Sequence, residues 1–355
     1  MLVCFVPICE YDMKNLLKTL LVLTFSTPLH AQEVKIFVWE HFISDSIIDQ
    51  FTKKTGHTVK QYFFDNEVER NSLLVNGQGA RYDLVLVDNA TTVTYGKEGV
   101  LASLSSLKID NIENNSIQSI EACNQYGVPY STGTMGIAHR SSISKEEINS
   151  WKQILTPSKE HIGTTMMLKD DVDTIAIALL AQGADPFSNN KSELVSAYSL
   201  LKNQSQYLLG YGYPLVYVDE HESASKLTLA VIYSGDIFNL KETTGQNDWE
   251  YVVPKEGSLL FVDCFTTPSG NVVKEATKAF LSFINEPNIA YANASEMWFS
   301  TTNEAAQLLA DDDYKNDSEI SPSVDILNRS YRYQPMSNEN RVIRNRMVSI
   351  LSVQE

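Results

Sequence analysis

The chain of 355 residues contains none of the sequence motifs that the common enzyme chemistries require. It has no Walker A phosphate loop, no GxGxxG after a predicted strand, no HExxH pair and no GxSxG elbow. Their absence argues against phosphoryl transfer, dinucleotide chemistry, zinc proteolysis and serine hydrolysis. We therefore expect a protein that is not an enzyme and needs no cofactor.

Long apolar runs are missing after the opening of the chain, so nothing later predicts a membrane-spanning helix. Residues 13–31 read MKNLLKTLLVLTFSTPLHA, which is the layout of a secretory signal peptide. We predict that residues 1–31 are the signal peptide, with cleavage after Ala31 and Met13 as an alternative start. A membrane anchor is disfavoured, because the apolar run is about half of the roughly 20 residues that a span needs. The mature protein is expected to work outside the cytoplasm.

Cysteine is rare. Of four cysteines, Cys4 and Cys9 lie in the segment that we expect to be removed. Cys123 and Cys264 remain, and an oxidising compartment would allow them to pair. Two isolated buried thiols are an equal alternative, because sequence does not fix the distance between them.

Positively charged residues are also few. Lysine and arginine number 28 against 44 acidic residues, which gives a formal net charge of −16. Nucleic-acid binders carry basic patches, so we expect no nucleic acid partner and no anionic membrane surface. A cationic ligand is compatible with this charge through long-range attraction.

Metal-ligand patterns are missing too. The six histidines are scattered without metal-ligand spacing. Residues 311–313 (DDD) resemble the start of a calcium loop, but Lys315 stands where a fifth-position ligand belongs and no glycine follows. We interpret this segment as a solvated acidic turn and expect no metal site.

What the chain does contain is an alternation of apolar strands and helices. Strands are expected at residues 34–39, 58–64, 82–87, 227–233 and 251–253, extended chain at 126–140, and helices near 44–56, 73–75, 150–155, 174–181 and 276–284. Strands separated by helices imply a parallel sheet with right-handed crossovers. The pattern restarts after Gly127 without a Pro/Gly-rich linker. This predicts two α/β lobes between which the chain crosses more than once.

The residues that follow the expected strands carry aromatic rings and carboxylates. Ligands of open α/β sheets bind beyond the carboxyl ends of the strands. The segments at those positions are Trp39-Glu40-His41-Phe42, Asp88-Asn89, Tyr233-Ser234 and Phe261-Val262-Asp263.

This combination suits a ligand that is cationic at intervals and apolar between, such as a linear polyamine. Aromatic faces attract ammonium groups by roughly 0.5–2 kcal/mol each, and flat rings cover methylenes. Carboxylates offset the desolvation cost of each buried ammonium. Taken one at a time, however, Trp39, Tyr233 and Phe261 could equally be core aromatics, and Asp88 and Asp171 could be helix caps.

Segments along nearly the whole mature chain match one family in order and spacing. They are VWEHF (38–42), IIDQFTKKTG (47–56), YDLVLVD (82–88), KEGVL (97–101), LKDD (168–171), VPKEGSLLFVD (253–263), STTNEAAQLL (300–309) and YQ (333–334). On these segments the chain resembles the periplasmic spermidine/putrescine-binding proteins (PotD/PotF-like). The resemblance implies a two-lobed α/β solute-binding protein fold with a hinge and an interlobe ligand cleft, located in the periplasm. It places residues 32–135 and 263–310 in lobe one, and residues 136–262 and 311–355 in lobe two.

The resemblance also implies which residues bind the ligand. They are Trp39, Glu40, Phe42, Asp88, Asp171, Tyr233, Phe261, Asp263, Phe299 and Gln334. Asp263 matches the central carboxylate that grips an amine, Asp171 a second ligand carboxylate and Gln334 a terminal polar contact. Phe42, Tyr233, Phe261 and Phe299 stand where the family has other aromatics.

Departures from the family pattern redistribute the acids of the pocket. Glu40 and Asp88 stand where small hydroxyl residues are common, whereas Thr174 and His41 replace acids, and Ala90 replaces a pocket aromatic. We infer a polyamine site with altered preference. Its four candidate acids, Glu40, Asp88, Asp171 and Asp263, suit a triamine better than a diamine.

The altered pocket favours the norspermidine-sensor (NspS-type) branch of the family. Such a protein binds norspermidine or spermidine and signals to an inner-membrane cyclic-di-GMP enzyme that controls biofilm. The alternative is the substrate-binding receptor of an ABC-type polyamine transporter, which hands its ligand to a permease. In either case we expect a monomer when the protein is free.

Overall fold

The computed structural model describes residues 31–64, 67–221 and 224–352. Residues 32–355 form a unit of their own, which begins at the residue after the predicted cleavage site. Apart from Ala31, the predicted signal peptide lies outside the described residues. Within the described ranges, no helix combines the length and the apolar content that a membrane span requires.

The strands of the described chain join into one mixed sheet. They are β1 (Glu33–Val38), β2 (Thr58–Phe63), β3 (Leu84–Asp88), β4 (Gly127–Arg140), β5 (Thr165–Met167), β6 (Leu208–Tyr211), β7 (Leu229–Tyr233), β8 (Trp249–Val252), β9 (Leu259–Thr266), β10 (Ser300–Thr301) and β11 (Tyr331–Arg332). Their order is β2-β1-β3-β9-β4-β7-β5-β6, with β10 and β8 beside β4 and β11 beside β9.

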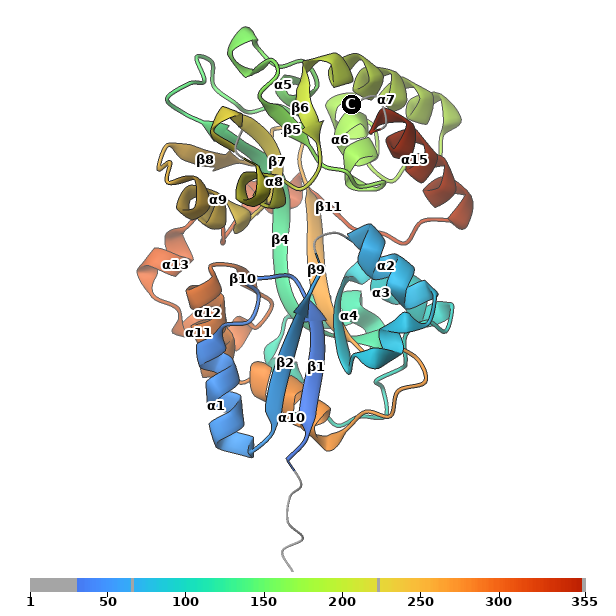
Figure 1. Ribbon diagram of the computed structural model, residues 1–355, viewed down its shortest axis with the longest axis vertical. Coiled ribbons are helices and arrows are strands. Elements are labelled where there is room, and N and C mark those ends of the chain that lie inside the picture. The colour runs from blue at the N-terminus through green and yellow to red at the C-terminus, as the bar shows by residue number, and fades with distance from the viewer. Residues whose placement is uncertain (1–30, 65–66, 222–223, 353–355) are drawn as a thin grey trace, which may run out of the picture. The chain divides into compact units, whose positions relative to one another are not determined.

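Strand β4 belongs to both halves of this sheet (Figure 1). Its first part, Gly127–Thr134, pairs with β9, and its second part, Met135–Arg140, pairs with β7 and β8. Strand β9 runs antiparallel to β4, so two adjacent strands carry the chain in opposite directions between the halves. The lobes are therefore joined through a shared strand rather than being separate sheets.

The predicted parallel pairing is confirmed for β1–β3 and for β5–β7 but is wrong for the pairs that involve β4 and β9. Strands β1, β2 and β3 are parallel, as are β5, β6 and β7. Strands β4 and β9 run antiparallel to each other, and β3 is antiparallel to β9. A helical crossover returns a strand in parallel, whereas β4 and β9 pass directly from one half to the other.

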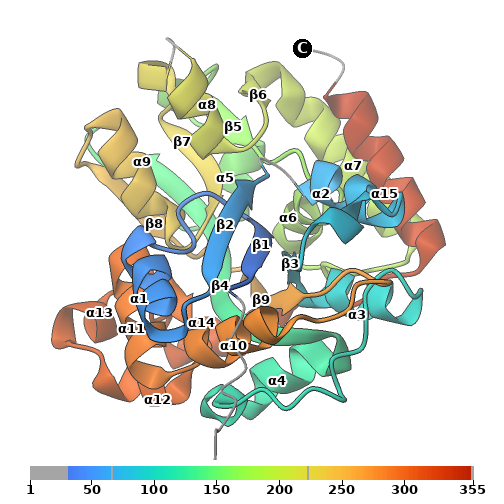
Figure 2. The same cartoon turned by 60° about the horizontal axis from the view of Figure 1, so that its bottom comes forward.

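Helices cover both faces of the sheet. They are α1 (Asp45–Thr55), α2 (Glu67–Val75), α3 (Asn89–Lys97), α4 (Ile117–Cys123), α5 (Trp151–Leu155), α6 (Asp173–Ala181), α7 (Lys191–Gln204), α8 (Pro214–Glu220), α9 (Asp236–Thr244), α10 (Glu275–Ile284), α11 (Pro287–Met297), α12 (Glu304–Leu309), α13 (Asp312–Asn316), α14 (Val324–Asn328) and α15 (Asn338–Leu351). Figure 2 shows α1 and α10 on one side of β1–β3 and α2 and α3 on the other.

Helix α1 illustrates how the sequence sets these elements. The Ser44 side chain accepts a hydrogen bond from the Ile47 N–H, which caps the first turn. Gly56 ends the helix with a φ of 73°, a left-handed conformation that glycine adopts without strain. Ile47 and Phe51 are buried against the sheet. The predicted boundaries of this helix are confirmed.

Two large apolar cores divide the chain. One draws its residues from Val34–Tyr130 and Phe265–Ile320, and the other from Met135–Leu259 and Val348–Leu351. We propose that these cores mark the two lobes, with crossings along β4, along β9 and before β11. Tyr314 and Ile320 are buried in the first core, so we now place residues 311–320 with lobe one.

A disulfide joins Cys123, the last residue of α4, to Cys264 in β9. The two positions are 141 residues apart in sequence, and both side chains are buried. Pairing is therefore the correct alternative of the two that the sequence left open, and it agrees with an oxidising compartment.

We expect the Cys123→Ser/Cys264→Ser double variant to lose about 2–5 kcal/mol of unfolding free energy, because the disulfide constrains a long loop of the unfolded chain. Guanidinium denaturation of the double variant, and of the wild type with and without reductant, measures this loss. Equal denaturation midpoints for the oxidised and reduced wild type would contradict the expectation.

Candidate ligand-binding cleft

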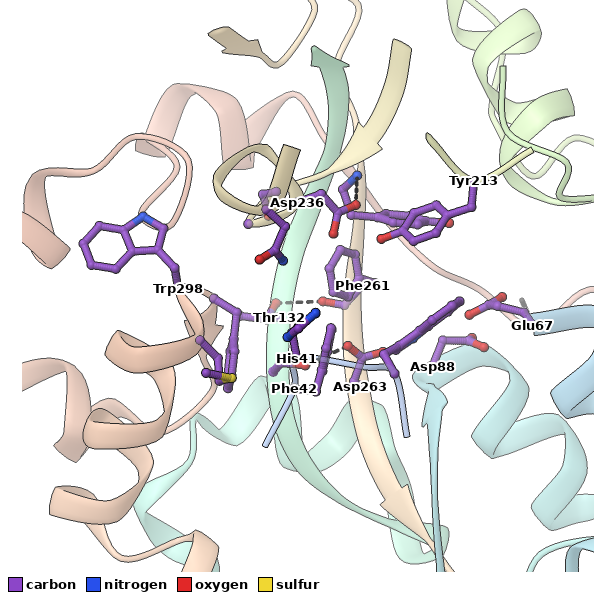
Figure 3. A pocket seen from close by; sticks show the side chains of 18 of the residues that line it. His41, Phe42, Glu67, Asp88, Thr132, Tyr213, Asp236, Phe261, Asp263 and Trp298 are labelled. Carbon is purple, nitrogen blue, oxygen red and sulfur yellow. Dashed lines mark hydrogen bonds between the residues drawn. The ribbon is translucent and has the colours of Figure 1, made fainter. Parts of the chain in front are cut away.

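A cavity of about 760 Å³, measured with its open mouth, lies where the two lobes meet. Its described lining comprises Trp39, His41, Phe42, Glu67, Asp88, Ser131, Thr132, Tyr213, Tyr233, Ser234, Gly235, Asp236, Asn239, Phe261, Asp263, Met297, Trp298, Phe299 and Tyr333. Figure 3 shows most of these side chains around the crossing strands β4 and β9. Seven of the ten predicted ligand-binding residues line it: Trp39, Phe42, Asp88, Tyr233, Phe261, Asp263 and Phe299.

A row of aromatic rings forms one wall of this cleft. The ring of Trp39 lies 5.7 Å from that of Tyr213, which lies 6.3 Å from Tyr233. Tyr233 in turn meets Phe261 edge-on at 5.6 Å between ring centroids. Trp39 follows β1 of lobe one and Tyr213 precedes α8 of lobe two, so the row crosses between the lobes.

A second aromatic pair also lines the cleft. The rings of Phe42 and Phe299 stack with their centroids 5.8 Å apart and their planes 10° apart. Phe299 is almost fully buried and also touches the first core, whereas Phe42 is only partly covered. Phe299 therefore both packs in the first core and lines the cleft.

Asp263 lies at the centre of the cleft on β9. It is buried, and the Ser131 hydroxyl of β4 donates a hydrogen bond of 2.7 Å to its Oδ2. Burial raises the pKa of Asp263 to about 7. A carboxylate so placed is stabilised in its ionised form by a cation that enters the cleft. The predicted position of Phe261 and Asp263 just after a strand is wrong, because both lie within β9.

Asp236 is a second buried carboxylate, and our sequence analysis missed it. It is the first residue of α9, and its Oδ2 accepts a hydrogen bond of 3.0 Å from the Tyr233 N–H. Burial raises its pKa to about 7. Asp236 lies two residues beyond Ser234, where the inspected segment stopped, so a slightly longer window after β7 would have included it.

Asp88 and Glu67 form a third acidic group, with Arg70 of α2 between them. Asp88 faces Asp263 in the antiparallel register of β3 and β9. Arg70 is fully buried, with its guanidinium nitrogens 3.5 Å from Asp88 Oδ2 and 3.2 Å from Glu67 Oε1. Asp88 Oδ1 accepts a hydrogen bond from the Thr91 N–H, so this residue both caps α3 and lines the cleft.

Asp173 holds two of the tyrosines that line the cleft in place through hydrogen bonds to their hydroxyl groups. The hydroxyl of Tyr233 donates a hydrogen bond of 2.6 Å to Asp173 Oδ2, and the hydroxyl of Tyr333 donates to Oδ1. Burial, and then the charge of Asp170, raise the pKa of Asp173 well above its ordinary value. This carboxyl orients the aromatic wall from α6 without lining the cleft.

The three remaining predicted residues lie elsewhere. Asp171 and Gln334 line an adjoining cavity, which shares Glu67, Asp88 and Tyr333 with the cleft. Glu40 is exposed and lines no described cavity, so we leave it out of the site proposed below.

Short elements explain why other lining residues were overlooked. Tyr213 follows the four-residue strand β6, which has no clear alternation. Glu67 begins α2, whereas only residues 73–75 had been assigned to a helix. Trp298 ends α11 in a left-handed conformation, with a φ of 55° that nothing in its residue type predicts.

The arrangement can hold a slender polycation. Aromatic faces cover apolar segments and attract ammonium groups, while separate carboxylates each neutralise one charge. Among the described residues, no group of three or more His, Cys, Asp or Glu side chains could hold a metal ion. Asp311 caps α13 through the Tyr314 N–H, in agreement with an acidic turn.

The raised pKa values predict how the stability of the ligand-free protein depends on pH. Asp236 and Asp263 titrate near 3.8 when unfolded and near 7 when folded, so the folded state binds more protons between these values. The free energy of unfolding should therefore fall as pH rises from about 4 to about 7.

Urea denaturation at pH 5 and pH 8 measures this decline. Asp263→Asn cannot titrate at this position, so its decline should be smaller than that of the wild type. A ligand-free wild type that is more stable at pH 8, or an equal decline in Asp263→Asn, would contradict the assignment.

Comparison with known proteins places the chain in a family. Residues 46–322 match the family described as bacterial extracellular solute-binding protein. The chain is 30% identical over 341 residues to the norspermidine sensor of Vibrio cholerae, covering 96% of this chain and 94% of the relative. It is 26% identical over 349 residues to the putrescine-binding periplasmic protein SpuD of Pseudomonas aeruginosa, covering 90% and 94%.

A solved structure agrees on the fold. The spermidine/putrescine ABC transporter substrate-binding protein PotD of Streptococcus pneumoniae superimposes with a TM-score of 0.74 at 21% identity. The superposition covers 91% of this chain and 99% of that structure. The predicted two-lobed fold with a ligand cleft at the hinge is thereby confirmed.

Proposed function

Because the chain belongs to the bacterial extracellular solute-binding protein family, we propose that it binds a linear polyamine in the cleft between its lobes. The observation that carries this proposal is the pairing of buried carboxylates with an aromatic wall. Asp236 and Asp263 face the cleft that Tyr213, Tyr233 and Phe261 line. Relatives named for norspermidine and putrescine support the same ligand class.

The family also fixes the class and the compartment of the protein. Its members are solute-binding proteins rather than enzymes, and they are extracellular by description. Relatives over most of this chain are named periplasmic, in agreement with the location that the opening segment predicts.

In the proposed complex, Asp263 grips an ammonium group while Trp39, Tyr233 and Phe261 cover the methylenes. Asp236 holds a second ammonium from the lobe-two side of the cleft. Phe42 and Phe299 also line the cleft, and Asp88 contributes negative charge that it shares with Arg70. Asp171 and Gln334 are placed to meet a ligand that extends into the adjoining cavity.

Asp263→Ala should weaken binding of spermidine and norspermidine several-hundred-fold or more. A buried ammonium would lose its anion, and removing one partner of such a pair costs roughly 3–5 kcal/mol. Asp263→Asn should recover little, because the amide supplies shape without charge. Isothermal titration calorimetry of both variants measures the loss.

Asp49→Ala is the matched control, since Asp49 is an exposed carboxylate on α1 that does not line the cleft. It should bind polyamines as the wild type does. Wild-type affinity in Asp263→Ala would place the site elsewhere, and a wild type that binds no polyamine would refute the proposed function.

For the role of this binding we propose a sensor subunit, which signals to an inner-membrane cyclic-di-GMP enzyme that controls biofilm. The 30% identity to a norspermidine sensor over nearly the whole chain supports this role. The second candidate is the receptor of an ABC-type polyamine transporter, which the similarity to a putrescine-binding periplasmic protein supports.

The sensor role predicts that two polyamines can bind yet close the lobes to different degrees. A ligand favours the closed form only by its differential affinity for that form, so ligands with different charge spacing act differently. Small-angle scattering with norspermidine and with spermidine measures closure. Affinity capture from solubilised membranes, followed by mass spectrometry, identifies the partner.

Capture of a membrane cyclic-di-GMP enzyme is the expected result. Recovery of a polyamine permease, together with polyamine import that depends on this protein, would exclude the sensor role in favour of the transport receptor. Identical closure with every polyamine would remove the idea of ligand-specific closure while leaving polyamine binding intact.

A further inference from the structure

Neighbouring side chains balance only part of the negative charge of the carboxylates that line the cleft. Four carboxylates line it: Glu67, Asp88, Asp236 and Asp263. Figure 3 shows Glu67 and Asp88 next to each other on one side of the cleft. Asp263 and Asp236 have hydrogen-bond donors from Ser131 and from the Tyr233 backbone, but neither donor carries a charge.

Arg70 supplies the compensating charge at the side where two acids meet. Its Nη1 lies 3.2 Å from Glu67 Oε1 and its Nη2 lies 3.5 Å from Asp88 Oδ2. Nη1 also donates a hydrogen bond of 3.3 Å to the Leu86 carbonyl, and the guanidinium lies 5.3 Å from the ring centre of Phe64. The side chain has no solvent exposure and does not line the cleft itself, so it is a buried charge behind Glu67 and Asp88.

We infer that Arg70 determines the charge preference of the cleft, by cancelling one of its four carboxylates and leaving three net negative charges for the ligand. This inference rests on the proposed function and deepens it, since three net charges match a triamine. Glu67 and Asp88 then act as one net negative charge, and Asp236 and Asp263 each act as one.

Two features suit Arg70 to this role. A guanidinium stays protonated under all ordinary conditions, so the compensation does not vary with pH. Burial alone lowers the pKa of Arg70, but the charges of Glu67, Asp88 and Asp263 reverse that effect and raise it. The positive charge of Arg70 is therefore present before a polyamine arrives, whereas Asp236 and Asp263 still titrate near pH 7.

The test compares two ligands of equal length that differ by one charge. Spermidine carries three amines, and 1,8-diaminooctane carries a methylene in place of the inner one. Calorimetric titration at pH 7.5 gives the affinity ratio of spermidine to the diamine. Ligand length cancels in this ratio, and the methylene that replaces the inner amine is the same in every variant, so the change of the ratio between variants reports the value of the third charge.

The variants should move this ratio in opposite directions. Arg70→Gln leaves an extra negative charge and should raise the ratio about tenfold, whereas Glu67→Gln removes one and should lower it about tenfold. The Arg70→Gln/Glu67→Gln double variant restores three net charges and should return the ratio to near the wild-type value. Loss of structure alone cannot produce opposite shifts and mutual compensation.

Three controls keep the test decisive. Arg70→Lys preserves the charge and should keep the wild-type ratio. Glu69→Gln removes the same charge two residues along α2, outside the cleft lining, and should also leave the ratio unchanged. Circular dichroism shows whether Arg70→Gln folds. If it does not, the affinity ratios of Glu67→Gln and Arg70→Lys still test the proposed role of Arg70.

Each outcome has one meaning. A wild type that binds neither ligand refutes the proposed function. A wild type that binds spermidine, with ratios that stay the same in Glu67→Gln and in folded Arg70→Gln, refutes only the role of Arg70. A ratio that falls in both single variants would show that Arg70 supports the fold of the wall rather than its charge.

Discussion

The burial of negative charge at one cleft is the constraint on which the rest of the structure depends. The register of β3 against β9 sets Asp88 opposite Asp263, and α9 begins with Asp236 at the same cavity. Taking carboxylates out of water costs several kcal/mol each unless cations or hydrogen bonds offset it. The protein offsets part of this cost with Arg70 and leaves the remainder to protonation or to a ligand. A site built in this way is least favourable when it is empty and ionised, which is the condition that a polycation relieves.

The same strands that hold the ligand groups also connect the lobes. Ser131 and Thr132 lie on β4, and Phe261 and Asp263 lie on β9, close to the point where β4 changes partners. Thr132 further donates a hydrogen bond to the Phe261 carbonyl, which ties the two strands together at the cleft. A ligand held here touches the crossing strands themselves and elements of both lobes. In the proposed complex, closure about these strands is thus coupled to the contacts that the ligand makes with both lobes.

The sequence was informative wherever a signal is local. The capped helix after Ser44 and the buried run of β3 could each be identified from a few neighbouring residues, whereas Asp263 was assigned from the family resemblance. Pairing across long separations could not. The direction of β9 depends on contacts with β3 and β4, more than 120 residues away along the chain, and no pattern within residues 259–266 specifies it. Arg70 was overlooked for the same reason, since a buried arginine in an amphipathic helix gains meaning only from its spatial partners Glu67 and Asp88.

Glu40 and Asp236 together show why the ligand class is easier to predict than the ligand residues. The family resemblance assigns ligand positions, and at one of them this chain carries Glu40 in place of a small hydroxyl residue, but Glu40 is exposed. The structure brings a different acid, Asp236, to the cleft from the opposite lobe. What a polycation requires is a number of negative charges and an apolar lining, and several arrangements of side chains satisfy that requirement equally well. Binding of this ligand class therefore depends more on the sum of charges around the cleft than on the position of any one carboxylate. On this argument, the proposed role of Arg70 requires only that the buried guanidinium changes the sum of charges, and not that it touches the ligand.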